Sequence, residues 1–432
     1  MNTAETIYET LVDEEDALAC AEIPEAACRE TPRNFVLILL AQLMTKLGDS
    51  LASPKTVLPW IMAGAGAPVA LTGLLVPIRE SGSLIPQLVI AGWVRRLAVR
   101  KWVWVLGSCA QAVCVLGIAA AAGLLEGPTA GWTIIGCLGL FSLARGFCSV
   151  ASKDVLGKTV PKKRRGRLTG WSASGAGLAS IFVGLALLLP LAGIGDAAGA
   201  GALVLAAGFL WLAGAAVFSR VSEYEGETEG GRNAIVGAWH RLSLLGTDRP
   251  FRRFVITRAL LLCSALSAPF YVLMAREQVG SPARLLGWFI VSAGLASLVS
   301  GPIWGRLADH SSRRVMSVAA TISGLIGILV FAAVQLVPAL AAHGAFFPVA
   351  YFCLAVAHDG VRVGRKTYIV DLAEGNRRTD YVSVSNSVIG VVLLLAGLTG
   401  TLSGVLSLSG VVLLLSIFGL AGAWLATRLP EV

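Results

Sequence analysis

The chain has 432 residues, of which 56% are apolar and 14% are charged, and its formal net charge is +9. Because soluble globular proteins carry about 25% charged residues, this composition, with a mean hydropathy of +0.75, excludes an ordinary soluble domain. Apolar stretches of roughly 20 residues, the length of a bilayer-crossing helix, lie between clusters of charge, and they predict a polytopic membrane protein.

The first 33 residues form an acidic segment, in which nine acids stand against two bases. The segment has neither a basic start nor an apolar run, so we expect no membrane span and no cleavable signal peptide in it. We predict that it is a cytoplasmic tail.

Twelve apolar spans follow, and we predict that all of them are helices, because lipid cannot satisfy the backbone groups of an open sheet edge. They cover residues 34–62, 68–91, 102–123, 131–152, 169–190, 198–219, 253–275, 285–304, 315–337, 345–364, 381–402 and 405–427. The longest polar gap lies between the sixth and seventh spans and has the composition of a flexible linker. We therefore divide the chain into a tail (1–33), a first half (34–219), a cytoplasmic linker (220–252), a second half (253–428) and a C-terminal tail (429–432).

The loops after even-numbered spans carry clusters of Lys and Arg, whereas the loops after odd-numbered spans hold only Arg276 and Arg284. Basic loops stay on the cytoplasmic side, so both termini are expected there, in a bacterial inner (plasma) membrane. The basic stretch VPKKRRGR is thus a topology signal that also favours anionic lipid headgroups, and not a nucleic-acid site. Membrane lipids are the expected surroundings, and we expect a monomer.

A short basic segment occurs twice, 213 residues apart. GRLADHSSRR spans residues 305–314, and a degraded copy, GWVRRLAVRK, spans 92–101. The same offset aligns Lys153 with Lys366 and Ser172 with Ser385. Two matches in one register, with six spans in each half, predict parallel repeats about an axis along the membrane normal.

The second copy resembles the signature loop of the major facilitator superfamily, G-x-L-A-D-r-x-G-r-[KR], and the resemblance covers about residues 34–428. It implies that superfamily's fold, an all-α membrane protein of twelve helices in two pseudo-symmetric six-helix halves. It also implies a cytoplasmic gate formed by Gly305, Asp309, Arg313, Arg314, Arg96 and Arg100. Asp309 would lie near a helix N-terminus and basic partners, and close the inner gate in the outward-facing state. Because Arg96 replaces this acid in the first copy, the first latch is expected to be weakened or wired differently.

Ionisable side chains are distributed selectively among the spans. The third, sixth, ninth and twelfth spans contain none, which agrees with the outer position that the resemblance implies for them, around a cavity lined chiefly by the first, fourth, seventh and tenth. A charge in a span costs roughly 2.5–3.5 kcal/mol, so charges there indicate function. The predicted substrate or ion-coupling residues are Lys46, Asp49, Arg79, Glu80, Arg145, His358, Asp359 and Arg362.

The pattern of these charges leaves alternatives open. Lys46 and Asp49 share a helix face and form either part of a site or a mutually neutralised structural pair. Arg79 and Glu80 point about 100° apart, so each needs a partner on another helix, with Lys46 and Asp49 as candidates. Arg258 in the seventh span is expected to reach the inner headgroups. The glycines of the eleventh span either permit bending or allow close packing.

These observations predict a secondary active transporter of a small molecule that works by alternating access. Arg145, which aligns with His358, and Arg362 are candidates for binding an anionic group, and Asp49, Glu80 and Asp359 are candidates for proton coupling. Alternatives are an exporter of amphiphilic or toxic compounds, and a transporter-like sensor or lipid scramblase without coupled solute. We expect no enzyme activity, cofactor or metal, because neither a Walker A loop nor a catalytic constellation occurs.

Overall fold

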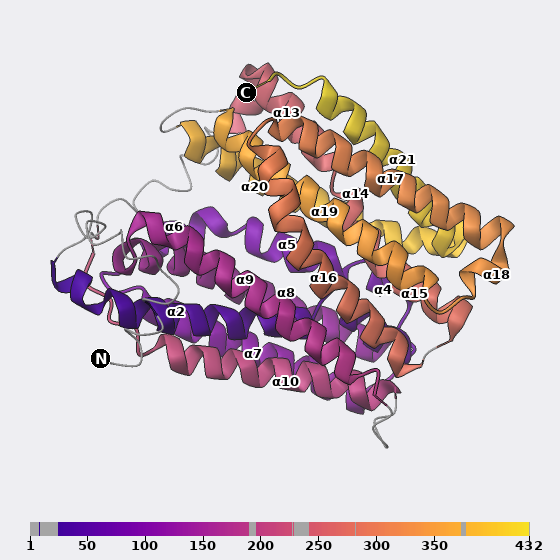
Figure 1. The fold of residues 1–432 in the computed structure, drawn as a ribbon, viewed down its shortest axis with the longest axis horizontal. Coiled ribbons are helices and arrows are strands. Elements are labelled where there is room, and N and C mark those ends of the chain that lie inside the picture. Colours follow the sequence, from indigo (N-terminus) through magenta and orange to yellow (C-terminus); the bar gives the residue numbers. More distant parts are fainter. Residues whose placement is uncertain are drawn as a thin grey trace.

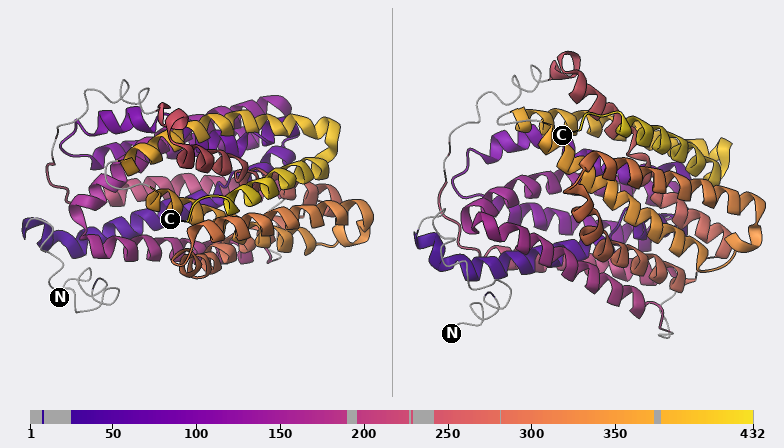
Figure 2. Two further views of the ribbon diagram at one scale, coloured as in Figure 1. Left: turned by 90° about the horizontal axis from the view of Figure 1, so that it is seen from above. Right: turned by 45° about the horizontal axis from the view of Figure 1, so that its top comes forward.

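The structure, a computed structural model, describes residues 8, 25–189, 196–226, 228, 242–280, 282–372 and 377–431, and this part of the chain is helical without strands. The long helices run side by side along one axis (Figures 1 and 2). The first six spans are α2 (Glu25–Leu51) with α3 (Val57–Gly64); α4 (Val69–Thr72), α5 (Leu75–Leu84) and α6 (Gln87–Val94); α7 (Lys101–Leu124); α8 (Gly127–Thr159); α9 (Lys162–Ala186); and α10 (Asp196–Phe218). The last six are α13 (Arg249–Leu260), α14 (Cys263–Leu266) and α15 (Ala268–Val279); α16 (Ala283–Ala308); α17 (Ser312–Leu336); α19 (Phe346–Asp371); α20 (Arg377–Ala396) with η2 (Gly397–Leu402); and α21 (Ser403–Thr427). Short helices α12 (Leu244–Thr247) and α18 (Pro338–Ala341) precede α13 and α19.

Within the described residues, eleven helical runs are long and apolar enough to cross a membrane, and the last, Tyr381–Thr427, has 47 residues. At 1.5 Å per residue it would extend for about 70 Å, more than twice the hydrocarbon core of a bilayer. Ser407 breaks it with a φ of 63°, and its hydroxyl accepts the N–H of Gly410 at 3.3 Å. The run is therefore two spans, and the predicted fold of twelve helices is confirmed.

The first and seventh spans are broken rather than continuous. In the first span, α2 ends at Leu51 and α3 begins at Val57, with Pro54 between them, where proline lacks the N–H that a helix needs. The seventh span breaks between α13 and α14 and again at Ser267. Pro59 lies inside α3.

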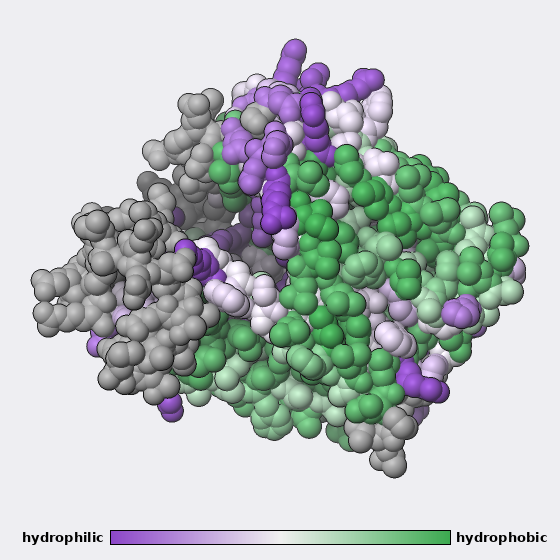
Figure 3. Space-filling model, in the orientation of Figure 1, coloured by the Kyte–Doolittle hydropathy of each residue, from purple (hydrophilic) through white to green (hydrophobic). Residues whose placement is uncertain are grey.

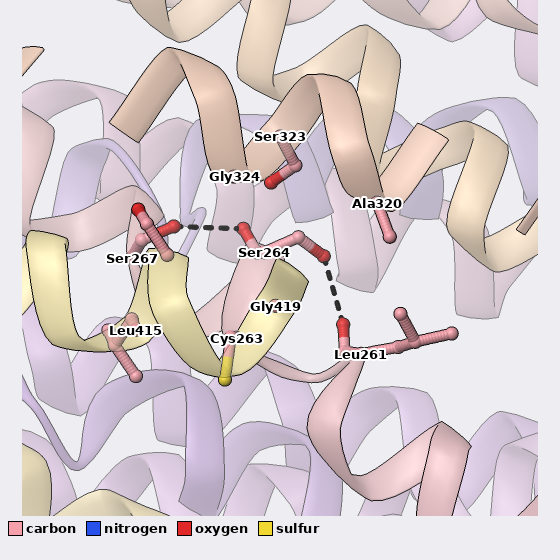
Figure 4. A pocket seen from close by; sticks show the side chains of 10 residues that line it. Leu261, Cys263, Ser264, Ser267, Ala320, Ser323, Gly324, Leu415 and Gly419 are labelled. Atoms are coloured by element: carbon pink, nitrogen blue, oxygen red, sulfur yellow. Dashed lines mark hydrogen bonds between the residues drawn. The ribbon is translucent and has the colours of Figure 1, made fainter. Parts of the chain in front are cut away.

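Serine hydroxyls satisfy backbone carbonyls at the break in the seventh span. Ser264 donates to the carbonyl of Leu261 at 3.1 Å, and Ser267 donates to that of Ser264 at 3.3 Å. These serines line a cavity of about 10 Å³ between α14, α17 and α21 (Figure 4), which is about the size of one water molecule. Such local bonds allow a broken helix to exist at membrane depth.

The first six spans meet the last six along two seams, α9 against α16 and the α4–α5 segment against α20–η2. Glycines permit both. A Cβ added to Gly287 on α16 would lie 2.8 Å from the carbonyl oxygen of Gly184 on α9, and one on Gly73 would lie 2.6 Å from the Cα of Gly400. Only glycine allows backbones to approach so closely.

The two sets of helices converge at one end of the bundle and diverge at the other (Figure 1). We call the diverging end the basic end, because the loops after α6 and α16 and the starts of α9 and α20 lie there, and the opposite end the far end. A broad apolar surface covers the flank, whereas hydrophilic side chains gather around a hollow at the basic end (Figure 3). Apolar flanks and polar ends are what an integral membrane protein requires.

The close approach at Gly400 gives a first prediction. Gly400→Ala places a methyl group 2.9 Å from the carbonyl oxygen of Ala70, and such overpacking costs about 1–3 kcal/mol. Gly404→Ala is the matched control, because no atom lies within 4 Å of its added Cβ. Thermal unfolding of the purified protein should show a lower Tm for Gly400→Ala alone. Equal Tm values would mean that the seam is looser than described.

Candidate functional site

A cavity of about 580 Å³ lies between the two sets of spans. It extends from the break in the first span toward the basic end, where Figure 3 shows the hollow. Its charged and hydrogen-bonding side chains are those of Lys55, Arg79, Glu80, Ser83, Gln87, Arg145, Ser149, Lys153, Arg258, His358, Arg362, Arg365, Lys366 and Asn386. Eight of these are Lys or Arg and one is an acid, so the lining is strongly cationic.

Among the described residues, the lining comes from six spans, and α7, α10, α17 and α21 contribute none of it, as expected for helices that do not line the cavity. The first, fourth, seventh and tenth spans contribute as expected. The second and eleventh spans contribute as much, through α5, α6 and α20.

The carboxylate of Asp49 on α2 joins two guanidinium groups on two other helices. Its Oδ1 lies 2.8 Å from Nη2 of Arg79 on α5, and its Oδ2 lies 2.6 Å from Nη1 of Arg145 on α8. Arg79 also lies over the ring of Phe141, 4.8 Å from the ring centroid. Asp49 was one of the two partners expected for Arg79, and the bridge confirms that pairing. One carboxylate thus neutralises part of the charge of two cations in the same cavity wall.

Lys46 does not pair with Asp49, so the mutually neutralised pair that was one alternative is wrong. Its ammonium instead donates to the carbonyl of Thr169 at 3.1 Å and to Oγ of Ser172 at 2.5 Å, both on α9. The physical reason is that Arg79 and Arg145 already hold both carboxylate oxygens of Asp49. Lys46 therefore links the first span to the fifth and does not line the cavity.

Arg258 in the seventh span repeats this arrangement in the second half. It donates to Oγ of Ser385 at 2.6 Å and to Oδ1 of Asn386 at 2.9 Å, both on α20. Ser385 is the residue that aligns with Ser172, the partner of Lys46, at the offset of 213. The expectation that Arg258 reaches the headgroups is wrong: its exposure is only 9%, and neutral partners inside the cavity hold it.

The predicted residues of the tenth span lie on the opposite wall. Nδ1 of His358 lies 3.0 Å from Oγ of Ser264, and Nε of Arg362 lies 3.6 Å from Oδ1 of Asp359. The side chain of Arg362 is 53% exposed. Glu80 is exposed to the cavity, and no ion pair of its carboxylate occurs among the described residues. Of the eight predicted residues, all but Lys46 therefore lie in or beside the cavities of this region.

Several lining residues were not among the predicted site. Lys55 is a charge inside the predicted first span, so the criterion that found Asp49 would also have found it. Arg365 and Lys366 follow Arg362 on α19 but stand close to the end of the predicted span. Asn386, which donates to Gln87 at 3.3 Å, is uncharged and left no signal.

At the basic end, Glu223, which follows the sixth span, forms two hydrogen bonds and an ion pair, a group of contacts that we call the first clasp. Its Oε2 accepts the backbone N–H groups of Arg100 and Lys101 at the N-terminus of α7, at 2.8 and 2.6 Å. Its Oε1 lies 2.8 Å from Nζ of Lys158, and its side chain is fully buried. A carboxylate is favoured at this positive helix end. Arg100 also pairs with Asp154 at 3.1 Å, whereas Arg96 is exposed, so the first loop is wired differently, as expected.

A second clasp holds the loop before α17. Ser311 donates to Oε1 of Glu431 at 2.6 Å, and Arg313 forms an ion pair with Glu431 and donates to the carbonyl of Leu429 at 2.9 Å. The hydrogen bond from Ser311 is the largest cause that lowers the pKa of Glu431, and Arg313 lowers it further. Glu431 comes after the twelfth span as Glu223 comes after the sixth.

Asp309 does not have the environment implied for it. It lies at the C-terminal end of α16, is exposed, and its carboxylate has no ion pair within the part of the chain that the structure describes. Its place at a C-terminus accounts for the difference, because a carboxylate is favoured at the positive N-terminal end of a helix and not at the C-terminal end. Gly305 has open space around it, and Arg314 is exposed, its backbone N–H bonded to Ser311 at 3.3 Å.

The far end is closed by contacts between the first and seventh spans. Nη1 of Arg276 on α15 donates to the carbonyl of Trp60 on α3 at 2.6 Å, and the guanidinium lies 4.6 Å from the centroid of the Trp60 ring. Both residues line an outer pocket of about 640 Å³ together with Glu126 and Thr129. The central cavity is therefore open toward one end and closed at the other.

Comparisons with known proteins agree with this architecture. A family model described as the Major Facilitator Superfamily matches residues 259–431. The match covers the second half of the chain and agrees with the resemblance of residues 305–314 to the signature loop of that superfamily. The family and the apolar helices support an integral membrane protein that transports a small molecule as a secondary transporter.

Solved transporters share the fold over nearly the whole chain. A POT family transporter in complex with 5-aminolevulinic acid has a TM-score of 0.70 at 11% identity and covers 95% of this chain and 98% of its own. The xylose transporter XylE from E. coli, in an inward open conformation, has a TM-score of 0.68 at 12% identity, with 92% and 97% covered. A nucleoside transporter has a TM-score of 0.67 at 11% identity, with 91% and 99% covered. No curated protein sequence matches the chain.

The two clasps should differ in strength. Glu223→Gln removes a buried charge that holds an ammonium and two backbone N–H groups, and hydrogen bonds to charged groups contribute about 1.5–3 kcal/mol each. Glu431→Gln removes an exposed carboxylate, so its effect on Tm should be smaller. Thermal unfolding of both variants at pH 7 measures the order, and a larger loss for Glu431→Gln would contradict it.

The second clasp should also respond to acid. Because the pKa of Glu431 is lowered in the folded protein, its contribution to stability is present above the ordinary value of about 4.3. It is lost as the pH falls through the lowered pKa. The Tm difference between wild type and Glu431→Gln should therefore disappear at acid pH. A constant difference would mean that the charge of Glu431 is not what closes the clasp.

Arg276→Ala should loosen the far end. The variant loses a charge-assisted hydrogen bond and a cation–π contact, together a shift of about tenfold or more in favour of opening. A cysteine introduced as Ser53→Cys should then react faster with an impermeant maleimide added from the far side. Arg284→Ala, an exposed arginine at the same end, is the control and should leave the rate unchanged. An equal rate in both variants would exclude Arg276 from the closure.

Proposed function

We propose that the protein is a secondary transporter of a small anionic solute, driven by protons and working by alternating access. The observation that carries the proposal is the cavity lining, with eight Lys or Arg side chains and one acid. Buried cations are costly unless they have counter-charges, and the described lining sets a single carboxylate, that of Glu80, against eight cations. An anionic solute supplies the missing charge.

The second half supports anion binding more directly than the first. Arg258 has the neutral partners Ser385 and Asn386, and Arg362 is half exposed. A guanidinium offers forked donors that match carboxylate or phosphate. An exporter of amphiphilic compounds is less well supported, because such a solute would leave this charge without a partner.

Asp49 supports a mechanism for proton coupling. While it is ionised, its two oxygens hold Arg79 and Arg145. A proton on Asp49 neutralises the carboxylate and releases both guanidinium groups, which then bind the oxygens of the solute. The proton removes the negative charge of Asp49, and the solute brings a negative charge in its place. The proton and the anion therefore move together. Glu80 and Asp359 are the other candidates for carrying the proton.

The direction of the cavity follows from the positive-inside rule. If the basic end faces the cytoplasm of a bacterial cell, both termini lie there and the present conformation is inward-facing. The closed contact of Arg276 with Trp60 is then the outer gate, and the exposed Asp309 belongs to an inner gate that is open. Closing this gate requires the two sets of spans to rock about their glycine seams, in a monomer surrounded by membrane lipids.

Flux into proteoliposomes tests the proposal. Radiolabelled phosphate, gluconate and citrate are offered with and without an acid exterior, and at least one should accumulate faster with the pH gradient. Arg145→Ala should slow that flux about tenfold to a hundredfold, because it loses charge-assisted hydrogen bonds to the solute. Asp49→Asn should retain exchange across equal pH but lose the response to the gradient.

The matched control is Arg249→Ala, an exposed arginine outside the cavity and the gate, which should transport as wild type does. A flux that ignores the pH gradient would exclude proton coupling. Anion binding that Arg145→Ala leaves unchanged would exclude the site, and stabilisation by lipids alone would favour a sensor or scramblase.

A further inference from the structure

Beside the cationic cavity lies a second, smaller cavity of about 230 Å³, which we call the side chamber. It lies between the break in the first span, α14, α16 and α19. Five of its lining side chains carry hydroxyl groups, namely Ser50, Ser53, Ser264, Ser297 and Tyr351. The chamber is thus rich in groups that both donate and accept hydrogen bonds.

Small side chains leave the chamber its room. Ala268, Ala293, Ala296 and Ala355 line it, and Leu354 is the one larger aliphatic residue in the described lining. Its volume is below the roughly 300–1,000 Å³ of pockets for drug-sized ligands. A chamber of this size and polarity suits a compact hydroxylated body and does not suit an apolar one, because an apolar body would leave buried hydroxyl groups unpaired.

The chamber and the cationic cavity share a wall formed by Lys55, His358 and Arg362. Lys55 lies at the break in the first span, where its backbone N–H bonds to Oγ of Ser53 at 3.2 Å. The described residues provide no ion pair for its ammonium. Arg362 lies 3.6 Å from Asp359, beyond hydrogen-bond distance, and is 53% exposed. Lys55 and Arg362 therefore lie where the side chamber joins the cationic cavity, with N–H groups available to bind a solute.

His358 is arranged to accept a hydrogen bond. Oγ of Ser264 lies 3.1 Å from the carbonyl oxygen of Leu261 and 3.0 Å from Nδ1 of His358, and both contacts are hydrogen bonds at once in the tautomer that carries its proton on Nδ1. Nε2 of a neutral imidazole then carries the lone pair. This nitrogen suits a hydroxyl group and not an anion.

We propose that the solute is a small polyhydroxylated organic anion, a sugar acid or a sugar phosphate. Its hydroxylated body occupies the side chamber, bonded to the serine hydroxyls and His358, and its carboxylate or phosphate lies between Lys55 and Arg362. The inference rests on the proposed anion transport and adds the chemistry of the rest of the solute. A site built to bond hydroxyl groups rejects an analogue without them strongly.

Direct binding to the purified full-length protein tests this assignment with three kinds of probe. Gluconate and glucose 6-phosphate carry both parts, acetate and inorganic phosphate carry the charge alone, and glucose and sorbitol carry the hydroxyl groups alone. At least one of the first pair should bind about tenfold or more tightly than the simple anion of the same charge type and than either neutral compound. Which of the two binds more tightly tells whether the anionic group is a carboxylate or a phosphate.

Two variants locate the hydroxylated part. Ser297→Ala should weaken the preferred probe about threefold to tenfold, the effect of one hydrogen bond, and leave acetate or phosphate unchanged. Ser300→Ala on the same helix is the control, because Ser300 does not line the chamber and its variant should bind every probe as wild type does. Ala296→Leu, which fills the chamber, should abolish the preference for hydroxylated anions.

The outcomes separate this inference from the proposed function. The side chamber would be overturned as a subsite, and anion transport left standing, by either of two results. One is that simple anions bind as tightly as gluconate and glucose 6-phosphate. The other is that Ser297→Ala weakens the binding of the simple anion as much as that of the preferred probe. Sorbitol that binds as tightly as gluconate would overturn the role of Lys55 and Arg362. No binding of any anion, or binding indifferent to Arg145→Ala, would instead overturn the proposed function itself.

Discussion

The bridge from Asp49 to Arg79 and Arg145 is the interaction on which the first half of the cavity depends. Removing one partner of a buried ion pair leaves an uncompensated charge and costs up to about 3–5 kcal/mol, and here a single carboxylate serves two cations at 2.8 and 2.6 Å. The bridge fixes the first span against the second and fourth, and Lys46 fixes it against the fifth. Two of the helices that line the first-half wall, α5 and α8, are therefore positioned by Asp49 on α2.

The two halves use one plan with different chemistry. A cation on the first or seventh span donates to a serine on the fifth or eleventh, as Lys46 does to Ser172 and Arg258 to Ser385. An acid that follows the sixth or twelfth span closes a clasp at the basic end. Between the halves, glycines bring backbones into direct contact, at Gly184 with Gly287 and at Gly73 with Gly400. The clasps lie within the halves and the glycine contacts lie between them.

How far the sequence predicts this site depends on the free energy that each side chain costs when it is placed in a membrane. Buried charges are conspicuous, so Asp49 and the wall of the tenth span could be predicted, and Lys55 was open to the same argument. Asn386 costs too little to leave a signal. Helical spacing brought Lys46 near Asp49 but could not show that other cations would take both of its oxygens. The environment expected for Asp309 came from the resemblance, and the sequence alone does not show which helix end its carboxylate lies against.

The distribution of counter-charges assigns different tasks to the two halves. In the first half, Asp49 holds two of the cations, Arg79 and Arg145, so in the proposed mechanism an anionic solute reaches them when that carboxylate is neutralised. In the second half, Arg258 has neutral partners and Arg362 is open to the cavity, so the proposed anion can bind there without this step. A solute that first binds to the second half would compete with Asp49 for Arg145 and thereby raise the affinity of Asp49 for a proton. By linkage, the proton raises the affinity for the solute by the same factor. In the proposed mechanism, the position of the Asp49 carboxylate therefore couples the movement of the proton to that of the solute.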